Sequence, residues 1–119
     1  MDYSFSGFHV IADIFFVPIE SLLYHEQINQ VLALAVERGG ASLIRVETAV
    51  YDSYGFTAFA LLKESHVSLH TYPEENAAFI DVFTCGKSNP RIIMDVLIDY
   101  FKPGKTVLTE ITRGYTADN

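Results

Sequence analysis

Residues 56–85 read FTAFALLKESHVSLHTYPEENAAFIDVFTC, and the pattern of this stretch decides the fold class. The apolar run 56–63 is typical of a strand, and apolar and polar side chains alternate in residues 66–70, as they do along a strand. The proline and asparagine of residues 73–76 indicate a turn, after which residues 77–84 alternate again. Strands joined by connections this short pair antiparallel, so we expect an antiparallel sheet.

Further strands are expected on both sides of this stretch. Residues 8–17 are rich in Val, Ile and Phe, which predicts a strand buried largely on both faces. Residues 43–51 alternate, and a turn at residues 52–55 joins them to the run 56–63 as a hairpin. A last strand is expected at residues 107–111.

Two helices complete the prediction. The first begins near Pro18, repeats apolar residues at helical spacing and stops at the glycines 39–40. The second places the apolar residues of segment 92–100 along one side and ends at residues 103–104, a proline and a glycine. The order β-α-β-β-β-β-α-β has too few helices for a doubly wound sheet. We therefore predict a single α+β domain, an antiparallel sheet with two helices packed on one face.

Composition and charge limit the classes of protein that fit. The chain has 119 residues, 50% of them hydrophobic and 19% charged, which is enough for one packed domain and excludes a disordered chain. The net charge of −7 opposes a nucleic-acid partner. Because Cys85 is the only cysteine, neither an intramolecular disulfide nor a Cys-rich zinc site is expected. With no signal peptide or membrane-spanning run recognised, we expect a cytoplasmic protein without a membrane partner.

Side chains that can do chemistry gather between residues 64 and 85. His66 and His70 are four residues apart, which on a strand is about 13 Å, so we expect no metal site. A Ser-His-Asp hydrolase is disfavoured because the chain lacks a Gly-x-Ser-x-Gly elbow. Taken singly, a serine, histidine or cysteine on a strand is more often a packing residue than a catalyst.

Taken together, two strings in this region carry a resemblance. Residues 64–74 read ESHVSLHTYPE and residues 81–86 read DVFTCG, and both closely resemble the short prokaryotic S-adenosylmethionine decarboxylase proenzymes. The similarity includes a Glu-Ser-His cleavage site, a histidine five residues after the serine and a cysteine twenty residues after it. Weaker similarity covers residues 7–15 and 113–114.

The resemblance implies that the chain cuts itself between Glu64 and Ser65. The products are a β chain of residues 1–64 and an α chain of residues 65–119. Ser65 Oγ attacks the Glu64 carbonyl to form an ester, and removal of the Ser65 Cα proton then expels the Glu64 carboxylate. Hydrolysis of the remaining dehydroalanine leaves a pyruvoyl group, the cofactor, at the new N-terminus.

The same resemblance assigns roles to three further side chains. Thr57 stands where the family has a serine that stabilises the oxyanion, and its additional methyl group restricts the rotamer. His70 is the base that removes the Cα proton. In the decarboxylation the pyruvoyl ketone forms a Schiff base with the substrate amine, and Cys85 is the proton donor to the resulting carbanion.

Residues for the substrate are implied as well. Glu74 is at the family position that accepts both ribose hydroxyls of S-adenosylmethionine, and Tyr51 is at the aromatic position that stacks on adenine. Phe5 or Phe8 is a candidate for a second ring, against the sulfonium.

Three functions are carried forward from the sequence. The first is a pyruvoyl-dependent S-adenosylmethionine decarboxylase of polyamine biosynthesis, which by resemblance works as a homodimer of αβ units. The second is an arginine or ornithine decarboxylase on the same scaffold, in which Asp13, Asp52 or Glu75 supplies a carboxylate to the cationic substrate. The third is a non-catalytic binding module built on the same sheet.

Overall fold

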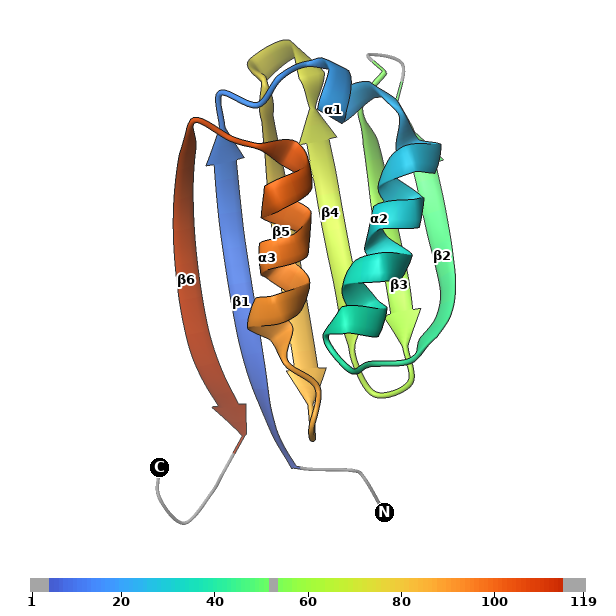
Figure 1. The fold of residues 1–119 in the computed structure, drawn as a ribbon, viewed down its shortest axis with the longest axis vertical. Helices are drawn as coiled ribbons and strands as arrows, with labels where there is room; N and C mark the ends of the chain where they lie inside the picture. The colour runs from blue at the N-terminus through green and yellow to red at the C-terminus, as the bar shows by residue number, and fades with distance from the viewer. Residues whose placement is uncertain (1–4, 52–53, 115–119) are drawn as a thin grey trace.

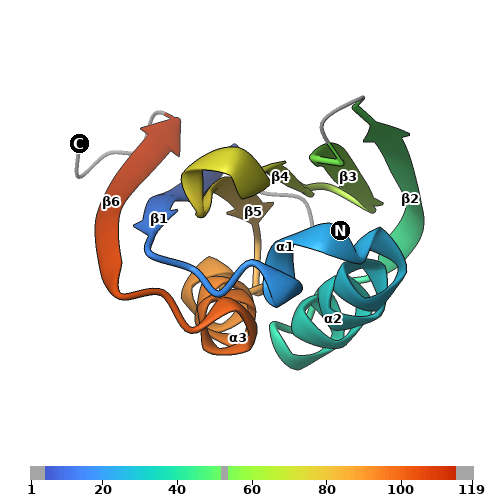
Figure 2. The same cartoon turned by 90° about the horizontal axis from the view of Figure 1, so that it is seen from above.

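A computed structural model describes residues 5–51 and 54–114 of the chain. Within these ranges the chain forms a six-stranded antiparallel sheet in the order β2-β3-β4-β5-β1-β6, with all helices on one face (Figures 1 and 2). The α+β prediction is therefore confirmed. The elements are β1 (Ser6–Phe15), α1 (Glu20–Leu23), α2 (His25–Arg38), β2 (Leu43–Val50), β3 (Phe56–Leu62), β4 (His66–Tyr72), a 3₁₀ turn (Pro73–Glu75), β5 (Ala77–Cys85), α3 (Pro90–Phe101) and β6 (Lys105–Gly114).

The first predicted helix is in fact two helices. Tyr24, at φ −108° and ψ 88°, leaves the helical region and separates α1 from α2. Leu22 on α1 and Ile28 on α2 are both fully buried. The break at Tyr24 lets two differently directed segments contribute to one core, which the apolar spacing alone does not show (Figure 1).

The core lies between the helices and one face of the sheet. On β3, Ala58 and Ala60 are fully buried, and these small side chains leave room for the large residues of the helices above them. The N-terminus of α3 is capped by Asn89, whose side-chain oxygen accepts hydrogen bonds from the backbone N–H groups of Arg91 and Ile92. The helices contribute to this core Leu22, Ile28, Leu32, Ala35, Val36, Ile93, Met94, Leu97 and Phe101.

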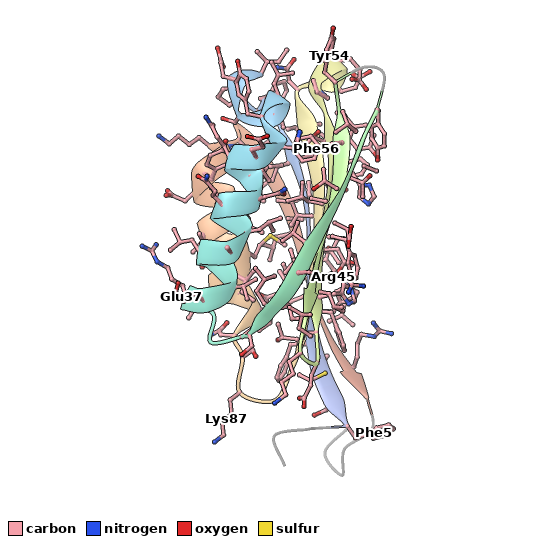
Figure 3. The ribbon with its side chains drawn as sticks, turned by 90° about the vertical axis from the view of Figure 1, so that its right-hand side faces the viewer. Phe5, Glu37, Arg45, Tyr54, Phe56 and Lys87 are labelled. Atoms are coloured by element: carbon pink, nitrogen blue, oxygen red, sulfur yellow. The ribbon has the colours of Figure 1, made fainter. Side chains whose placement is uncertain are left out.

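The other face of the sheet, which we call the open face, has no helix over it in the described ranges (Figures 2 and 3). Phe59 and Phe79 are 38% and 40% exposed on this face, although they stand in the middle of strands. The expectation that residues 8–17 are buried on both faces is wrong. On β1 buried residues alternate with half-buried ones, because no second layer covers the open face.

Pairing explains the length of the last strand. β6 pairs with the whole of β1, from Ser6 with Gly114 to Phe15 with Lys105, so it extends beyond the predicted residues 107–111. Among the described residues, no helix is both long enough and apolar enough to cross a membrane.

Candidate functional site

The predicted cleavage site and Cys85 lie together at one end of the sheet. Ser65 stands just before β4 and Cys85 is the last residue of β5. The backbone N–H of Cys85 donates a hydrogen bond of 3.2 Å to Ser65 Oγ. A cavity of about 260 Å³ borders these two residues together with Lys63 and Glu64. The spacing of twenty residues in the sequence is thus a direct contact in the fold.

The surroundings of Cys85 favour the protonated thiol. Burial, and then the Glu64 carboxylate, raise the pKa of Cys85 above the usual thiol value. Loss of the proton would place a negative charge in a partly desolvated position near an existing carboxylate. Cys85 is therefore suited to donate a proton rather than to act as a thiolate nucleophile.

The predicted base and oxyanion donor form a second group on neighbouring strands. Thr57 on β3 is paired in register with His70 on β4, and Thr57 Oγ1 and His70 Nδ1 share a hydrogen bond of 2.9 Å. The Tyr51 hydroxyl forms a further hydrogen bond to Thr57 Oγ1. The three side chains form a connected series that fixes the orientation of the imidazole.

The predicted substrate residues lie near this second group. Glu74 is exposed in the 3₁₀ turn that directly follows β4. Asp13 is half-buried on β1 and is paired with Phe79, which is itself paired with His70. Glu75 is also exposed, in the same turn as Glu74, whereas Asp52 lies outside the described residues.

The two groups are at opposite ends of the sheet. Five residues of extended chain separate Ser65 from His70, which corresponds to about 17 Å. Figure 3 shows the two ends, with Phe5 and Lys87 at the cleavage-site end and Tyr54 at the other. A base must come within hydrogen-bond reach of its proton, so one chain does not bring His70 to Ser65.

A third group lies between them and was not recognised in the sequence. Asp81 on β5 forms a hydrogen bond through Oδ1 to His9 Nε2 on β1, and its Oδ2 is 3.8 Å from His66 Nε2 on β4. The guanidinium of Arg113 on β6 lies over the Phe83 ring, 5.1 Å from the centroid. Alternation on β5 places Asp81 on the open face, but only the pairing register with β1, β4 and β6 brings the other residues to it.

The described residues contain no group of three or more His, Cys, Asp or Glu side chains arranged to hold a metal ion.

Comparisons with known proteins agree with one another. The family model described as S-adenosylmethionine decarboxylase matches residues 8–114. The S-adenosylmethionine decarboxylase proenzyme 2 of a Bacillus cereus strain is 37% identical, over 96% of this chain and 94% of that protein. The proenzyme of a Methanococcus maripaludis strain is 37% identical over 94% of this chain and 93% of its own length. The crystal structure of the adenosylmethionine decarboxylase from Aquifex aeolicus superposes with a TM-score of 0.85 at 29% identity, covering 95% of this chain and 94% of that one.

Proposed function

The chain belongs to the S-adenosylmethionine decarboxylase family, and from this premise we propose that it is a self-processing enzyme that converts S-adenosylmethionine into decarboxylated S-adenosylmethionine and CO₂. The product is an aminopropyl donor for polyamine biosynthesis. The observation that carries the proposal is the contact between Ser65 Oγ and the Cys85 backbone, beside Glu64. It joins the residue that is cut and the proposed proton donor in one place.

Self-processing cuts the bond between Glu64 and Ser65. This bond lies in the connection between β3 and β4, which is closed by a hydrogen bond of 3.0 Å from the Leu62 N–H to the Ser65 carbonyl. Glu64 is exposed and Ser65 half-buried, so the bond is accessible while the serine is held. The Cys85 N–H donates to Ser65 Oγ and positions that oxygen for attack on the Glu64 carbonyl carbon.

The site is completed by a second copy of the chain. Two copies packed through their open faces about a two-fold axis bring Thr57 and His70 of each copy to Ser65 and Cys85 of the other. The 17 Å separation within one chain, about five strand residues, supports this arrangement because the same rotation completes both sites. The exposed Phe59 and Phe79 on the open face support it as well, since covering these rings in an interface removes apolar surface from water.

In the completed site each side chain has one task. His70 removes the Ser65 Cα proton once the ester has formed, and the Thr57 hydroxyl donates to the oxyanion that precedes the ester. The pyruvoyl group left by Ser65 supplies a ketone that holds the substrate amine and accepts the electrons of decarboxylation. Cys85, whose raised pKa keeps the thiol protonated, donates the proton that replaces the carboxylate.

The substrate residues follow the same division between copies. Glu74 and Tyr51 lie at the His70 end, so the partner subunit's Glu74 and the partner's Tyr51 contact the nucleoside at each cleavage site. A carboxylate that accepts both ribose hydroxyls and an aromatic face for adenine suit a nucleoside better than a basic amino acid.

Intact-protein mass spectrometry with chemical trapping tests this proposal. The purified protein is weighed, incubated separately with S-adenosylmethionine, arginine and ornithine under cyanoborohydride reduction, and weighed again. We expect chains of residues 1–64 and 65–119, with the second carrying pyruvoyl and trapping S-adenosylmethionine alone. Trapping of arginine or ornithine instead would assign the amino-acid decarboxylase function, and an uncut chain would favour a non-catalytic binding module. The Ser65→Ala variant, expected to stay uncut, is the control.

A further inference from the structure

A small pocket lies on the open face on the far side of Cys85 from the cleavage-site cavity. It has a volume of about 230 Å³ and is bordered by Phe5, Gly7, Phe83, Cys85 and Arg113. Cys85 borders both this pocket and the cavity that holds Glu64 and Ser65. Cys85 therefore separates the cleavage site from the pocket, with one on each side of it.

Gly7 forms the floor of this pocket. It is paired with Cys85 on β5 and with Arg113 on β6, so these two side chains flank a position that carries none. A β-carbon at Gly7 would lie 2.6 Å from two atoms of the Phe83 ring and 2.9 Å from the Thr84 carbonyl oxygen. The Cα atoms of Cys85 and Arg113 are two strand spacings apart, about 10 Å, a gap that the long arginine side chain can enter.

The guanidinium of Arg113 is held in place without a carboxylate. Its Nη1 donates to His9 Nδ1 at 3.4 Å, and the same imidazole is bonded through Nε2 to Asp81. Because the Asp81 carboxylate accepts from Nε2, the hydrogen is assigned to Nε2 and Nδ1 is left as the acceptor. The Phe83 ring supports the guanidinium from one side.

The remaining donors of Arg113 are available for a ligand. Among the ion pairs of residues 5–51 and 54–114, Arg91 holds both Asp95 and Glu110, whereas Arg113 has no carboxylate within 4.0 Å. A guanidinium has five N–H donors, and its preferred partner is a carboxylate bound through two parallel hydrogen bonds.

We propose that Arg113 binds the α-carboxylate of the substrate in this pocket, a role that rests on the proposed decarboxylase function. The substrate amine is held at Ser65, and Cys85 protonates the adjacent carbon, so the carboxylate on that same carbon must lie close to Cys85. The pocket shared by Cys85 and Arg113 meets this requirement.

The chemistry of the reaction gives this contact a particular energetic effect. The bond between the α-carbon and the carboxylate carbon breaks, neutral CO₂ leaves, and Cys85 gives the α-carbon a proton that the thiolate recovers from water. The carboxylate charge that Arg113 binds is thus lost as the reaction proceeds. Arg113 stabilises the bound substrate more than the transition state and releases the product, so its removal raises KM without lowering kcat.

Two substitutions and a control measure this effect. Arg113→Ala removes the guanidinium, Arg113→Lys keeps a charge but not the paired donors, and Arg38→Ala removes an exposed arginine from the last turn of α2. Each protein is weighed to confirm cleavage. KM and kcat are then determined with S-adenosylmethionine, and affinity for decarboxylated S-adenosylmethionine is measured by competition and by calorimetry.

For Arg113→Ala we expect KM to rise about tenfold to hundredfold, the range for hydrogen bonds to a charged group, with kcat unchanged or higher. Affinity for the decarboxylated compound should stay within about twofold of wild type, since it has no carboxylate to lose. The KM of Arg113→Lys should lie between those of wild type and Arg113→Ala, and the KM of Arg38→Ala should match that of wild type. An equal loss of affinity for both compounds, or a fall in kcat at constant KM, would overturn the proposal.

Failure of the proposed function is distinguishable from failure of this role. A wild-type protein that is cut but decarboxylates arginine or ornithine contradicts the proposed substrate. Affinities for that amino acid and for the amine it yields are then compared. Arg113→Ala must again weaken binding of the amino acid and leave binding of the amine unchanged. If Arg113→Ala does not mature, Arg113→Lys provides the comparison.

Discussion

The two ends of the sheet differ in the side chains that they bring together. At one end Ser65 and Cys85 are in contact, with the scissile bond beside them. At the other, Thr57 and His70 are hydrogen-bonded to each other, with Tyr51 behind them. In the proposed mechanism the first end has a nucleophile without a base and the second a base without a nucleophile. This difference supports the proposal that a complete site takes both ends, and hence two copies of the chain.

Removal of the proposed base, His70, is expected to have the largest effect on maturation. His70→Ala should stop maturation at the ester, because no group is then positioned to take the Ser65 Cα proton. Hydroxylamine, which attacks esters, should cut the stalled protein between residues 64 and 65, and mass spectrometry detects the fragments. Ser68→Ala is the matched control, since Ser68 is on the same strand and face but is paired with Phe59 instead of Thr57. A His70→Ala protein that matures at the wild-type rate would refute the role of His70.

Substitution of Cys85, at the other end of the sheet, should leave maturation unchanged and lower kcat. Cys85→Ser keeps the backbone N–H that positions Ser65 but replaces the thiol by a much weaker acid, so we expect kcat to fall by about 10²- to 10⁴-fold. The α chain should also gain mass during turnover as protonation goes to the cofactor instead of the product. Unchanged kcat with unmodified α chain would argue against Cys85 as the proton donor.

Substitution of the proposed oxyanion donor, Thr57, is expected to slow chain cleavage without stopping it. Thr57→Val removes the hydroxyl while keeping the branched shape, and cleavage should slow by about 10²-fold. Thr57→Ser keeps the hydroxyl without the methyl group that restricts its rotamer, so cleavage should be as fast as in wild type or a few times faster. The rate of chain cleavage measures both. Equal rates for valine and threonine at this position would exclude the hydroxyl from processing.

The smallest expected effect concerns pH. Burial and the Glu64 carboxylate raise the pKa of Cys85, so in the uncut Ser65→Ala chain the thiol should become reactive toward an alkylating reagent only above the usual thiol pKa, as it loses its proton. Adding Glu64→Gln to this chain removes the second of these causes and should move the rise in alkylation rate to lower pH, while burial keeps it above the ordinary thiol value. The rate of Cys85 alkylation is measured for both chains across the alkaline range. A rise that moves to higher pH would contradict the electrostatic assignment.

Much of the fold was predictable because its signals are local. The alternation in residues 66–70 and 77–84 predicts β4 and β5 and assigns Asp81 and Phe83 to one face, as the structure shows. The helix break at Tyr24 was not predictable, since the apolar spacing continues through it. Burial on both faces of β1 was predicted from its apolar composition, but coverage of a strand depends on layers that a single chain does not provide.

The candidate site, like the fold, was predictable only where its signals are local in the sequence. The strings at residues 64–74 and 81–86 contain Ser65, His70 and Cys85, and strand geometry alone separates Ser65 from His70 by about 17 Å. The contacts of His9 and Arg113 could not be predicted, because they depend on the register of β1 with β5 and β6, which are distant in the sequence. Side-chain alternation defines a face, whereas the neighbours on that face are defined by pairing.

Mixing two inactive variants tests whether each site is shared between two copies of the chain. Ser65→Ala and His70→Ala, distinguished by tags of different mass, are dissociated together, reassembled and weighed over time. If the site is shared, each mixed dimer joins Ser65 of the His70→Ala chain to His70 of its partner, so the His70→Ala chain should be cut, in up to about half of its copies for random pairing. If mixed dimers form and the His70→Ala chain stays whole, the site is contained within one chain, which contradicts the proposal of a shared site.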